Sequence, residues 1–227
     1  MEKERYIKEK KIAHRGVHEK YLENTIPAFL EAVKRGYAIE LDIQFTKDEK
    51  IVVFHDESLK RIFGVNKYIS FLDYEEINKC YSCIPLLSEV LELVKGKVTL
   101  LIEIKWDKRM KSFIRNLINL LKNYQGEVYL MSFYFCSFYY LKRYHSPFKF
   151  GYLLNRYLPN FSFLKLILKF NLFHFDFLVV DLFLLKDPII CRFYQKNYLL
   201  GYTIYSYQEY FKYQEYADNF IWDAYHY

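Results

Sequence analysis

The feature that most constrains the fold is an alternation, along the whole chain of 227 residues, between short apolar runs rich in β-forming residues and segments of helical periodicity. This alternation is typical of βα units around a parallel sheet. It predicts eight strands, the number that a closed (β/α)₈ barrel needs. The predicted strands are Ile12–Gly16, Ile39–Phe45, Thr99–Ile104, Val128–Phe133, Lys149–Leu154, Phe177–Leu182, Leu199–Tyr205 and Asn219–Asp223.

Two predicted helices are especially clear. Asn24 or Thr25 can cap the first helix, Pro27 lies in its first turn, and Gly36 supplies its end. The second helix runs from Pro85 to Lys95 and carries leucine and valine at helical spacing. Both helices fit between predicted strands, as a barrel of βα units requires.

One segment departs from the alternation. Ile51–Phe54 is predicted as a short additional strand, and Glu57–Ser82 as a loop-rich insertion before the next helix. Long loops in compact barrels are commonly functional. No repeat, linker or low-complexity block divides the chain, so we expect one domain over residues 1–227 with an insertion at residues 57–82.

Composition limits the classes of partner. The net charge is +6, but Lys and Arg are scattered, which disfavours nucleic acid and remains compatible with an anionic substrate. Charged residues interrupt Phe161–Leu185, so we expect no stable membrane span and interpret this stretch as an amphipathic helix followed by a buried strand. No apolar signal core follows the N-terminal charges, and the lone Cys80/Cys83 pair suits free thiols in a reducing cytosol; a cytoplasmic location is therefore expected.

Two carboxylates lie close together on a predicted strand. Glu40 and Asp42 are two residues apart, so both side chains point to the same face, in the barrel interior or at its mouth. Unpaired carboxylates are costly there, and a divalent cation such as Mg²⁺ or Ca²⁺ would relieve that cost. Taken alone, the pair fits better with one carboxylate in a buried ion pair and the other exposed.

The next barrel strand repeats the pattern. Glu103 and Lys105 are expected at its carboxyl end, where active sites of (β/α)₈ barrels lie. Glu103 is a candidate third metal ligand, and Lys105 a candidate partner for a phosphate. A buried salt bridge between strands is the alternative.

Two histidines follow apolar runs near the same carboxylates. His14 ends the first predicted strand, and His55 follows the additional strand. Imidazole is the usual proton shuttle near pH 7. Arg15 adds a bidentate donor suited to a phosphate.

Several ordered motifs together carry a resemblance to a known family. They are Ala13-His14-Arg15-Gly16, Glu23-Asn24-Thr25, Ala28-Phe29, Glu40-Leu41-Asp42-Ile43 with Thr46 and Asp48, Val52-Val53-Phe54-His55-Asp56, Ile84-Pro85-Leu86-Leu87, Glu103-Ile104-Lys105 and Ser132-Phe133. In this order they resemble the glycerophosphodiester phosphodiesterase family. The strong match covers residues 12–105 and is weak beyond them.

The resemblance implies a (β/α)₈ fold and metal-dependent hydrolysis of a small-molecule glycerophosphodiester to an alcohol and glycerol 3-phosphate. It implies an Mg²⁺ or Ca²⁺ cofactor. The roles that it carries over are metal binding for Glu40, Asp42 and Glu103, acid and base for His14 and His55, and phosphate binding for Arg15 and Lys105. It does not say which histidine is the acid.

The C-terminal half departs from the family pattern. Tyr202-Thr203 stands where the family usually has Trp-Thr, and Trp222-Asp223-Ala224-Tyr225 stands where it has Thr-Asp-x-Pro. We therefore expect a truncated last βα unit with the final helix missing. Tyr202 and Trp222 are candidates for walling the alcohol side of the pocket, together with aromatic residues of the insertion: Phe63, Tyr68, Phe71, Tyr74 and Tyr81. The alternative is that the insertion aromatics only pack the loop onto the barrel.

Two other functions stay open. The first is a lysophospholipase D-like phosphodiesterase that acts on a lipid, with peripheral contact between the aromatic loops and the lipid surface. The second is a catalytically silent barrel that binds a phosphodiester. Two histidines beside three carboxylates disfavour the silent barrel, because binding alone has no chemical need for them.

Overall fold

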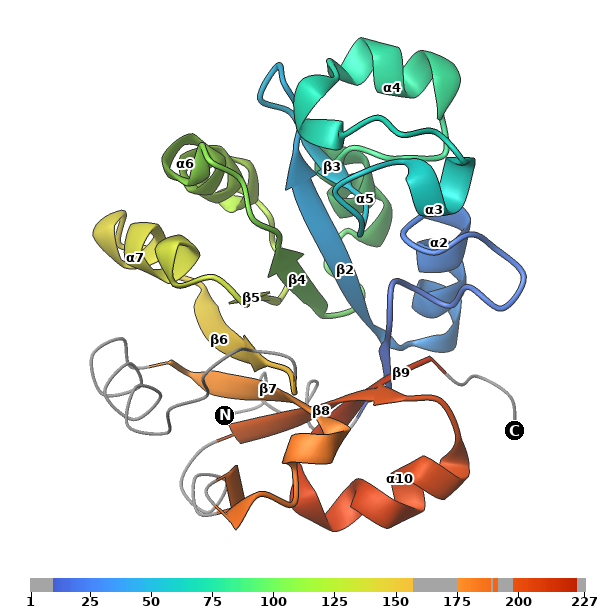
Figure 1. The fold of residues 1–227 in the computed structure, drawn as a ribbon, viewed down its shortest axis with the longest axis vertical. Helices are drawn as coiled ribbons and strands as arrows, with labels where there is room; N and C mark the ends of the chain where they lie inside the picture. The colour runs from blue at the N-terminus through green and yellow to red at the C-terminus, as the bar shows by residue number, and fades with distance from the viewer. Residues whose placement is uncertain (1–9, 157–174, 189, 192–197, 224–227) are drawn as a thin grey trace.

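The computed structural model describes residues 10–156, 175–188, 190–191 and 198–223. Its centre is a ring of eight parallel strands, closed where β1 pairs with both β2 and β9 (Figure 1). The strands of the ring are β1 (Ile12–Ala13), β2 (Ala38–Phe45), β4 (Leu100–Ile104), β5 (Val128–Ser132), β6 (Lys149–Leu154), β7 (Phe177–Asp181), β8 (Tyr198–Ile204) and β9 (Asn219–Trp222). The predicted (β/α)₈ barrel is confirmed.

Helices pack around the outside of this ring (Figure 1). They are α2 (Ile26–Arg35), α5 (Leu87–Val94), α6 (Met110–Leu121), α7 (Phe135–Arg143) and α10 (Tyr207–Tyr213), with short 3₁₀ turns η2 (Leu182–Leu184) and η3 (Gln214–Tyr216). The predicted end of the first helix is confirmed, because Gly36 has φ +67° and its N–H bonds back to the last turn.

The predicted additional strand is also present. β3 (Ile51–Val53) pairs antiparallel with β2, so the chain turns back beside the barrel before the insertion begins. The insertion is more ordered than its loop-rich sequence indicates. It contains α3 (Lys60–Phe63), η1 (Ile69–Phe71) and α4 (Tyr74–Cys80), because Leu59, Ile69 and Ile77 bury a small apolar core of their own.

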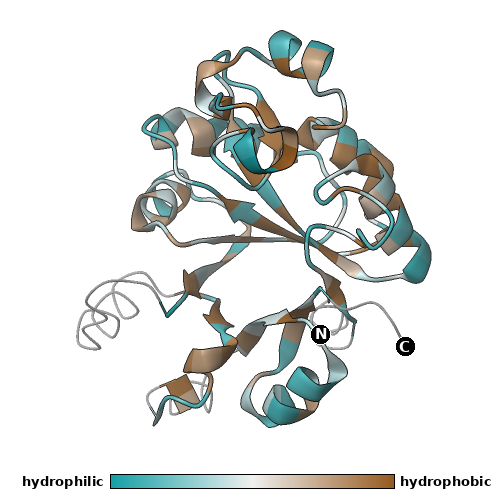
Figure 2. Cartoon of the chain, turned by 45° about the vertical axis from the view of Figure 1, so that its right-hand side comes forward, coloured by the Kyte–Doolittle hydropathy of each residue, from teal (hydrophilic) through white to brown (hydrophobic). Residues whose placement is uncertain are grey.

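Alternation along the strands divides the main core into two layers. One set of side chains fills the barrel interior, including Leu101, Val179 and Ile221. The other set faces the helices, including Leu100 and Ile102. Figure 2 shows the strands largely in hydrophobic colours, as expected for a parallel sheet covered by helices. Interior side chains therefore recur every second residue, and this period delivers polar residues to the barrel mouth.

Two expectations fall on parts of the chain outside the described residues. The amphipathic helix expected at the start of Phe161–Leu185 lies within residues 157–174, whereas the buried strand expected after it is present as β7. The missing final helix concerns residues 224–227. Within the described ranges, no helix has the length and apolar character needed to cross a membrane.

Candidate active site

Three carboxylates meet at the carboxyl ends of β2 and β4. Glu40 and Asp42 point inward from β2, and Asp42 lies directly opposite Glu103 in the parallel register with β4. All three residues are buried, and one oxygen from each carboxylate lies within 4.8 Å of the others. The structure therefore brings together the three residues that the sequence indicated as metal ligands.

Two cations lie against these carboxylates. Lys105 Nζ lies 2.7 Å from Asp42 Oδ1 and also donates to Glu103. The Arg15 guanidinium Nε is 3.4 Å from Asp42 Oδ2, and the Arg15 backbone N–H donates to Glu40 Oε2 at 3.0 Å. Asn24 Nδ2 donates to Asp42 Oδ2 at 2.8 Å. Asp42 is thus the most fully paired of the three acids.

The pKa values follow this pairing. Burial and the neighbouring charges of Asp42 and Glu103 raise the pKa of Glu40 well above its ordinary value. Burial would also raise the pKa of Asp42, but Lys105, His55 and Arg15 hold it below its usual range. Burial would lower the pKa of Lys105, but Asp42 and Glu103 raise it, so this ammonium stays charged. Of the three acids, Glu40 is therefore the one with the least compensating positive charge beside it.

A tight turn after β1 aims the Arg15 backbone at Glu40. Arg15 has φ +56° and Gly16 has φ +81°, both in the left-handed region. A Cβ at position 16 would lie 2.9 Å from the backbone carbon of Ala28 and 2.9 Å from the Phe29 ring. Glycine is therefore required at position 16 for two reasons: the backbone conformation there and the close approach of α2.

His14 is paired with an acid from the last barrel strand. Its Nδ1 lies 3.3 Å from Asp223 Oδ2, and its backbone N–H donates to the carbonyl of Trp222 at 2.9 Å. The other oxygen of Asp223 lies 2.7 Å from His18 Nε2. Burial lowers the pKa of His14, while Asp223 opposes that shift. Burial would raise the pKa of Asp223, but hydrogen bonds with the two imidazoles hold it well below its ordinary value.

His55 has an equivalent partner in the next residue. Its Nδ1 lies 2.5 Å from Asp56 Oδ1. The N–H of Phe54 donates to the carbonyl of Asp42 at 3.0 Å and so holds this segment beside the carboxylates. Burial lowers the pKa of His55, whereas Asp42 raises it and Lys105 lowers it further. Asp42 acts on the pKa of both histidines.

Arg61, from α3 of the insertion, joins these groups from outside. Its Nε lies 2.6 Å from Asp56 Oδ2, and its Nη1 and Nη2 lie 3.0 and 2.5 Å from the two oxygens of Glu23. Glu23 also accepts from Arg15 Nη1 at 2.8 Å. The insertion is therefore connected to the partner of His55 and to the partner of Arg15 through one guanidinium.

Tyr202 and Trp222, predicted as substrate-binding residues, lie in different layers. Tyr202 faces the barrel interior and donates from its hydroxyl to the carbonyl of Leu154 at 3.0 Å. Trp222 is only 3% exposed and packs between β9 and α10, with ring centroids 4.9 Å from Tyr210. Trp222 therefore lies in the helix-facing layer, whereas Ile221 occupies the interior-facing position of β9.

The five aromatic residues of the insertion differ in how far they are exposed. Phe63, Tyr74 and Tyr81 pack against its small core, as the packing alternative predicted. Tyr68 and Phe71 are exposed, at 43% and 65%, and their rings contact each other. Of these five aromatic residues, Tyr68 and Phe71 are the most exposed, whereas Phe63, Tyr74 and Tyr81 are partly buried.

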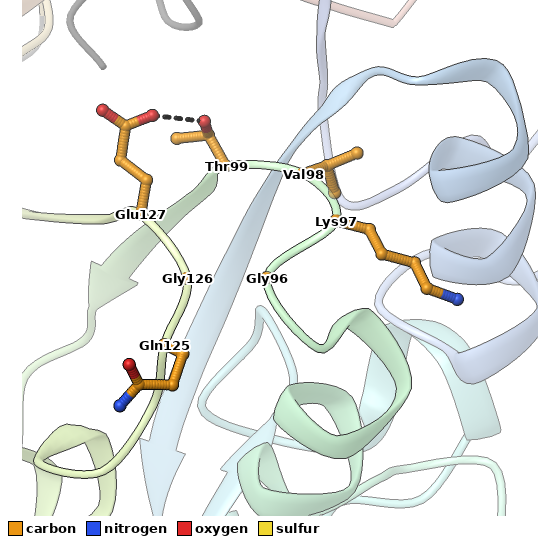
Figure 3. A pocket seen from close by; sticks show the side chains of 7 residues that line it. All are labelled: Gly96, Lys97, Val98, Thr99, Gln125, Gly126 and Glu127. Carbon is orange, nitrogen blue, oxygen red and sulfur yellow. Dashed lines mark hydrogen bonds between the residues drawn. The ribbon is translucent and has the colours of Figure 1, made fainter. Parts of the chain in front are cut away.

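A hollow of about 370 Å³ lies at the opposite end of the barrel (Figure 3). Residues 96–99 and 125–127, which precede β4 and β5, form its walls. Thr99 donates to Glu127 across it at 2.6 Å. This hollow therefore lies at the amino ends of the strands, and none of the mouth carboxylates or histidines lines it.

Six residues of the mouth had no role in the sequence-based site hypothesis: His18, Glu23, Asn24, Asp56, Arg61 and Asp223. Asp56 could have been found because it follows His55 directly. Asp223 could have been found because it ends the last predicted strand two residues after an interior position. Arg61 gave no such signal, since its place depends on how the insertion folds.

The fold is shared with a family of phosphodiesterases. The model of the glycerophosphoryl diester phosphodiesterase family matches residues 14–130, which are 117 of the 227 residues. The chain belongs to this family.

Proteins of similar sequence include a lysophospholipase D and a glycerophosphodiester phosphodiesterase. Human lysophospholipase D GDPD1 is 39% identical over 143 residues, which are 55% of this chain and 44% of that protein. A glycerophosphodiester phosphodiesterase from Bacillus altitudinis is 39% identical over 105 residues, covering 41% of this chain and 43% of the relative. The chain thus spans less than half the length of these two curated relatives.

Solved structures match over nearly the whole chain. The crystal structure of glycerophosphodiester phosphodiesterase from Thermotoga maritima superposes with a TM-score of 0.81 at 27% identity, covering 93% of each chain. An Oleispira antarctica phosphodiesterase, solved with the product sn-glycerol-3-phosphate, gives a TM-score of 0.81 at 19% identity over 94% of this chain and 92% of that one. The second likeness supports the fold alone.

Proposed function

We propose that this chain is a divalent-cation-dependent phosphodiesterase that hydrolyses glycerophosphodiesters to an alcohol and glycerol 3-phosphate. The observation that carries the proposal is the contact of His14 and of His55 with two different carboxylates, beside a cluster of three buried acids. His14 contacts Asp223, and His55 contacts Asp56. An imidazole oriented by a carboxylate is suited to exchange protons through its other nitrogen.

The donor set fits a hard divalent cation. Glu40, Asp42 and Glu103 supply oxygen ligands, the type that Mg²⁺ and Ca²⁺ prefer. With Arg15 and Lys105 charged, the three carboxylates leave one negative charge in excess, and burial together with the neighbouring charges of Asp42 and Glu103 raises the pKa of Glu40. A bound divalent cation would make this set positive by one charge and would stabilise negative charge on phosphoryl oxygens.

Arg15 and Lys105 have a second role in this proposal. Both cations lie at the carboxylates and are fixed by them. They would bind the non-bridging oxygens of the diester and oppose the charge that develops there. Tyr202 would line the interior side of the same pocket, since its ring faces the barrel axis.

The histidines divide the proton transfers. One removes a proton from the nucleophile, which is water or a neighbouring hydroxyl of the glycerol, and the other protonates the leaving alcohol. Burial lowers the pKa of both imidazoles, which favours the neutral base form. Asp223 and Asp56 oppose this shift at their respective histidines and support the protonated acid form.

The same site serves a second candidate substrate. A lysophospholipid is also a glycerophosphodiester, and human GDPD1, a relative at 39% identity, is named a lysophospholipase D. A silent phosphodiester-binding barrel is disfavoured, because the imidazole–carboxylate pairs are needed for proton transfer and not for binding. The cytoplasmic location stays a prediction.

A substrate panel tests this proposal. Glycerophosphocholine, glycerophosphoethanolamine, glycerophosphoglycerol and a lysophospholipid would each be incubated with Mg²⁺ or Ca²⁺. Released glycerol 3-phosphate, or lysophosphatidic acid for the lipid, would be measured against His55→Ala as control. Turnover that is lost in His55→Ala supports the proposal. Diester binding without turnover by the wild type would support the silent barrel instead.

A further inference from the structure

Large apolar side chains are exposed around the mouth of the barrel. They occupy loops, and in one case the 3₁₀ turn η2, that directly follow strands β1, β4, β5, β7 and β8. We call this set the mouth rim, and its members are Tyr21, Leu22, Trp106, Tyr134, Phe183 and Tyr205. Trp106 is 51% exposed, Phe183 64% and Tyr205 62%.

The opposite end of the barrel has no equivalent. In the described loops that precede the strands, at residues 36–37, 95–99, 122–127, 144–148 and 217–218, no large apolar side chain is exposed. The other exposed large apolar residues are on helices or in the insertion, such as Tyr139 on α7 and Phe211 on α10. Single exposed apolar residues scattered over a surface need no explanation, but a group of them around one end of the barrel does.

The rim surrounds the proposed reaction centre. Trp106 is the residue after Lys105, and Glu103 and Lys105 both act on the pKa of Tyr134. A protein partner that covered all of the rim would close the mouth through which a diester enters. A lipid surface can contact separate loops at once and can deliver the substrate, so it fits the arrangement better.

The rim also has suitable chemistry. Trp and Tyr rings prefer the boundary between headgroups and acyl chains. The Arg156 guanidinium lies 3.5 Å from the centre of the Phe183 ring, so a cation lies beside an exposed apolar group. Lys20 is exposed next to Tyr21, and Lys108 is exposed close to Trp106. Glu57 is an exposed acid close enough to Tyr134 to act on its pKa. The net charge of +6 adds attraction to anionic lipid.

We propose that the mouth rim docks the barrel onto a phospholipid surface, so that lipid-borne diesters such as lysophospholipids reach the site from the membrane or micelle. The substrate class rests on the proposed function, whereas the docking itself does not. Binding strength should grow with the apolar area that enters the interface.

Vesicle binding tests the docking without any turnover. Wild-type protein would be sedimented with vesicles of equimolar phosphatidylcholine and phosphatidylglycerol. Trp106→Ser/Phe183→Ser/Tyr205→Ser removes three rings of the rim. Each ring that enters the interface is worth about tenfold in partitioning, so the triple variant should bind at least about a hundredfold more weakly. The matched control is Tyr139→Ser/Phe211→Ser, which removes rings of 51% and 65% exposure from helices and should bind like wild type.

The chain also contains a fluorescent reporter. Its two tryptophans are Trp106, which is exposed, and Trp222, which is buried. In Trp222→Phe, with folding checked by circular dichroism, the single Trp106 should shift its emission to shorter wavelength when vesicles are added. An unshifted spectrum would overturn the proposal, as would equal binding by the triple variant and wild type, or no vesicle binding by wild type.

Turnover separates this inference from the proposed function. The triple rim variant should hydrolyse water-soluble glycerophosphocholine like wild type but lose most activity on lysophospholipid micelles. Loss on the soluble diester as well, with folding intact, would overturn the docking role, since the rings would then serve catalysis. A protein that binds vesicles but hydrolyses no glycerophosphodiester would contradict the proposed function alone.

Discussion

The carboxylate of Asp223 links two imidazoles at the mouth of the barrel, with Oδ2 3.3 Å from His14 Nδ1 and Oδ1 2.7 Å from His18 Nε2. Asp223 directly follows the last barrel strand and His14 directly follows the first, so this contact forms only when the ring of strands closes. The orientation of a proposed catalytic group therefore depends on barrel closure.

Asp223→Asn should lower kcat by about tenfold to a hundredfold with little change in KM, because His14 loses the group that orients it. Asp223 raises the pKa of His14, so its removal should lower that pKa. Whichever limb of the pH–rate profile reports His14 should move to lower pH. Profiles of kcat for wild type, Asp223→Asn and His18→Gln would check this. A limb that stays in place in Asp223→Asn would contradict the pairing.

Arg61 should matter because its planar guanidinium contacts Asp56 and Glu23 at once. Arg61→Gln should lower kcat by about tenfold, since Asp56 and Glu23 would each lose one of the two groups that hold it, and their partners His55 and Arg15 would be less well oriented. Arg61→Lys should rescue only part of this loss, because an ammonium cannot reproduce the fork geometry. Lys60→Gln, one residue earlier on α3, is the matched control and should behave like wild type. Full activity in Arg61→Gln would show that the insertion does not support catalysis through Arg61.

The two histidines should act as one unit. His14→Ala and His55→Ala should each lower turnover by about a hundredfold or more, the usual effect of losing a general acid or base. The double variant should lose much less than the product of the two single losses. Single-turnover rates on one glycerophosphodiester would measure all three. Near-normal turnover in either single variant would exclude that histidine from proton transfer.

Gly16→Ala tests the turn that positions Arg15. Its φ of +81° and the 2.9 Å approach of Ala28 and Phe29 leave no room for a methyl group. We expect a loss of about 1–3 kcal/mol in the free energy of unfolding, measured by urea denaturation. Gly64→Ala is the control for backbone conformation alone, because φ there is +72° with no atom near the added Cβ. Equal losses at both positions would mean that the contact with α2 adds nothing.

The sequence predicted the barrel because its strands are apolar runs separated by helical periodicity, and all eight were found. It also brought Glu40, Asp42 and Glu103 together correctly, since alternation along a strand and register between parallel neighbours are local properties. It did not predict the place of Trp222. In β9 the interior-facing residue is Ile221, so the next residue, Trp222, faces the helices; this phase is fixed by pairing with β1 and β8, not by composition.

Long-range pairing explains the other residues that sequence reasoning missed. Arg61 reaches Glu23 across 38 residues, and Asp223 reaches His14 across 209. Neither separation follows from any local period. The order within the insertion was missed for a similar reason, because its small core joins Leu59, Ile69 and Ile77 from segments that separately look like loop.

The most direct test of the account is the dependence of glycerophosphodiester hydrolysis on a divalent cation bound by Glu40, Asp42 and Glu103. Activity would be measured in excess chelator, after readdition of Mg²⁺ or Ca²⁺, and in Asp42→Asn, which is nearly isosteric. Cation affinity of each protein would be measured by calorimetry. We predict that activity vanishes in chelator, returns with the cation, and needs a much higher cation concentration in Asp42→Asn. Full activity in excess chelator, or unchanged cation affinity in Asp42→Asn, would contradict the account.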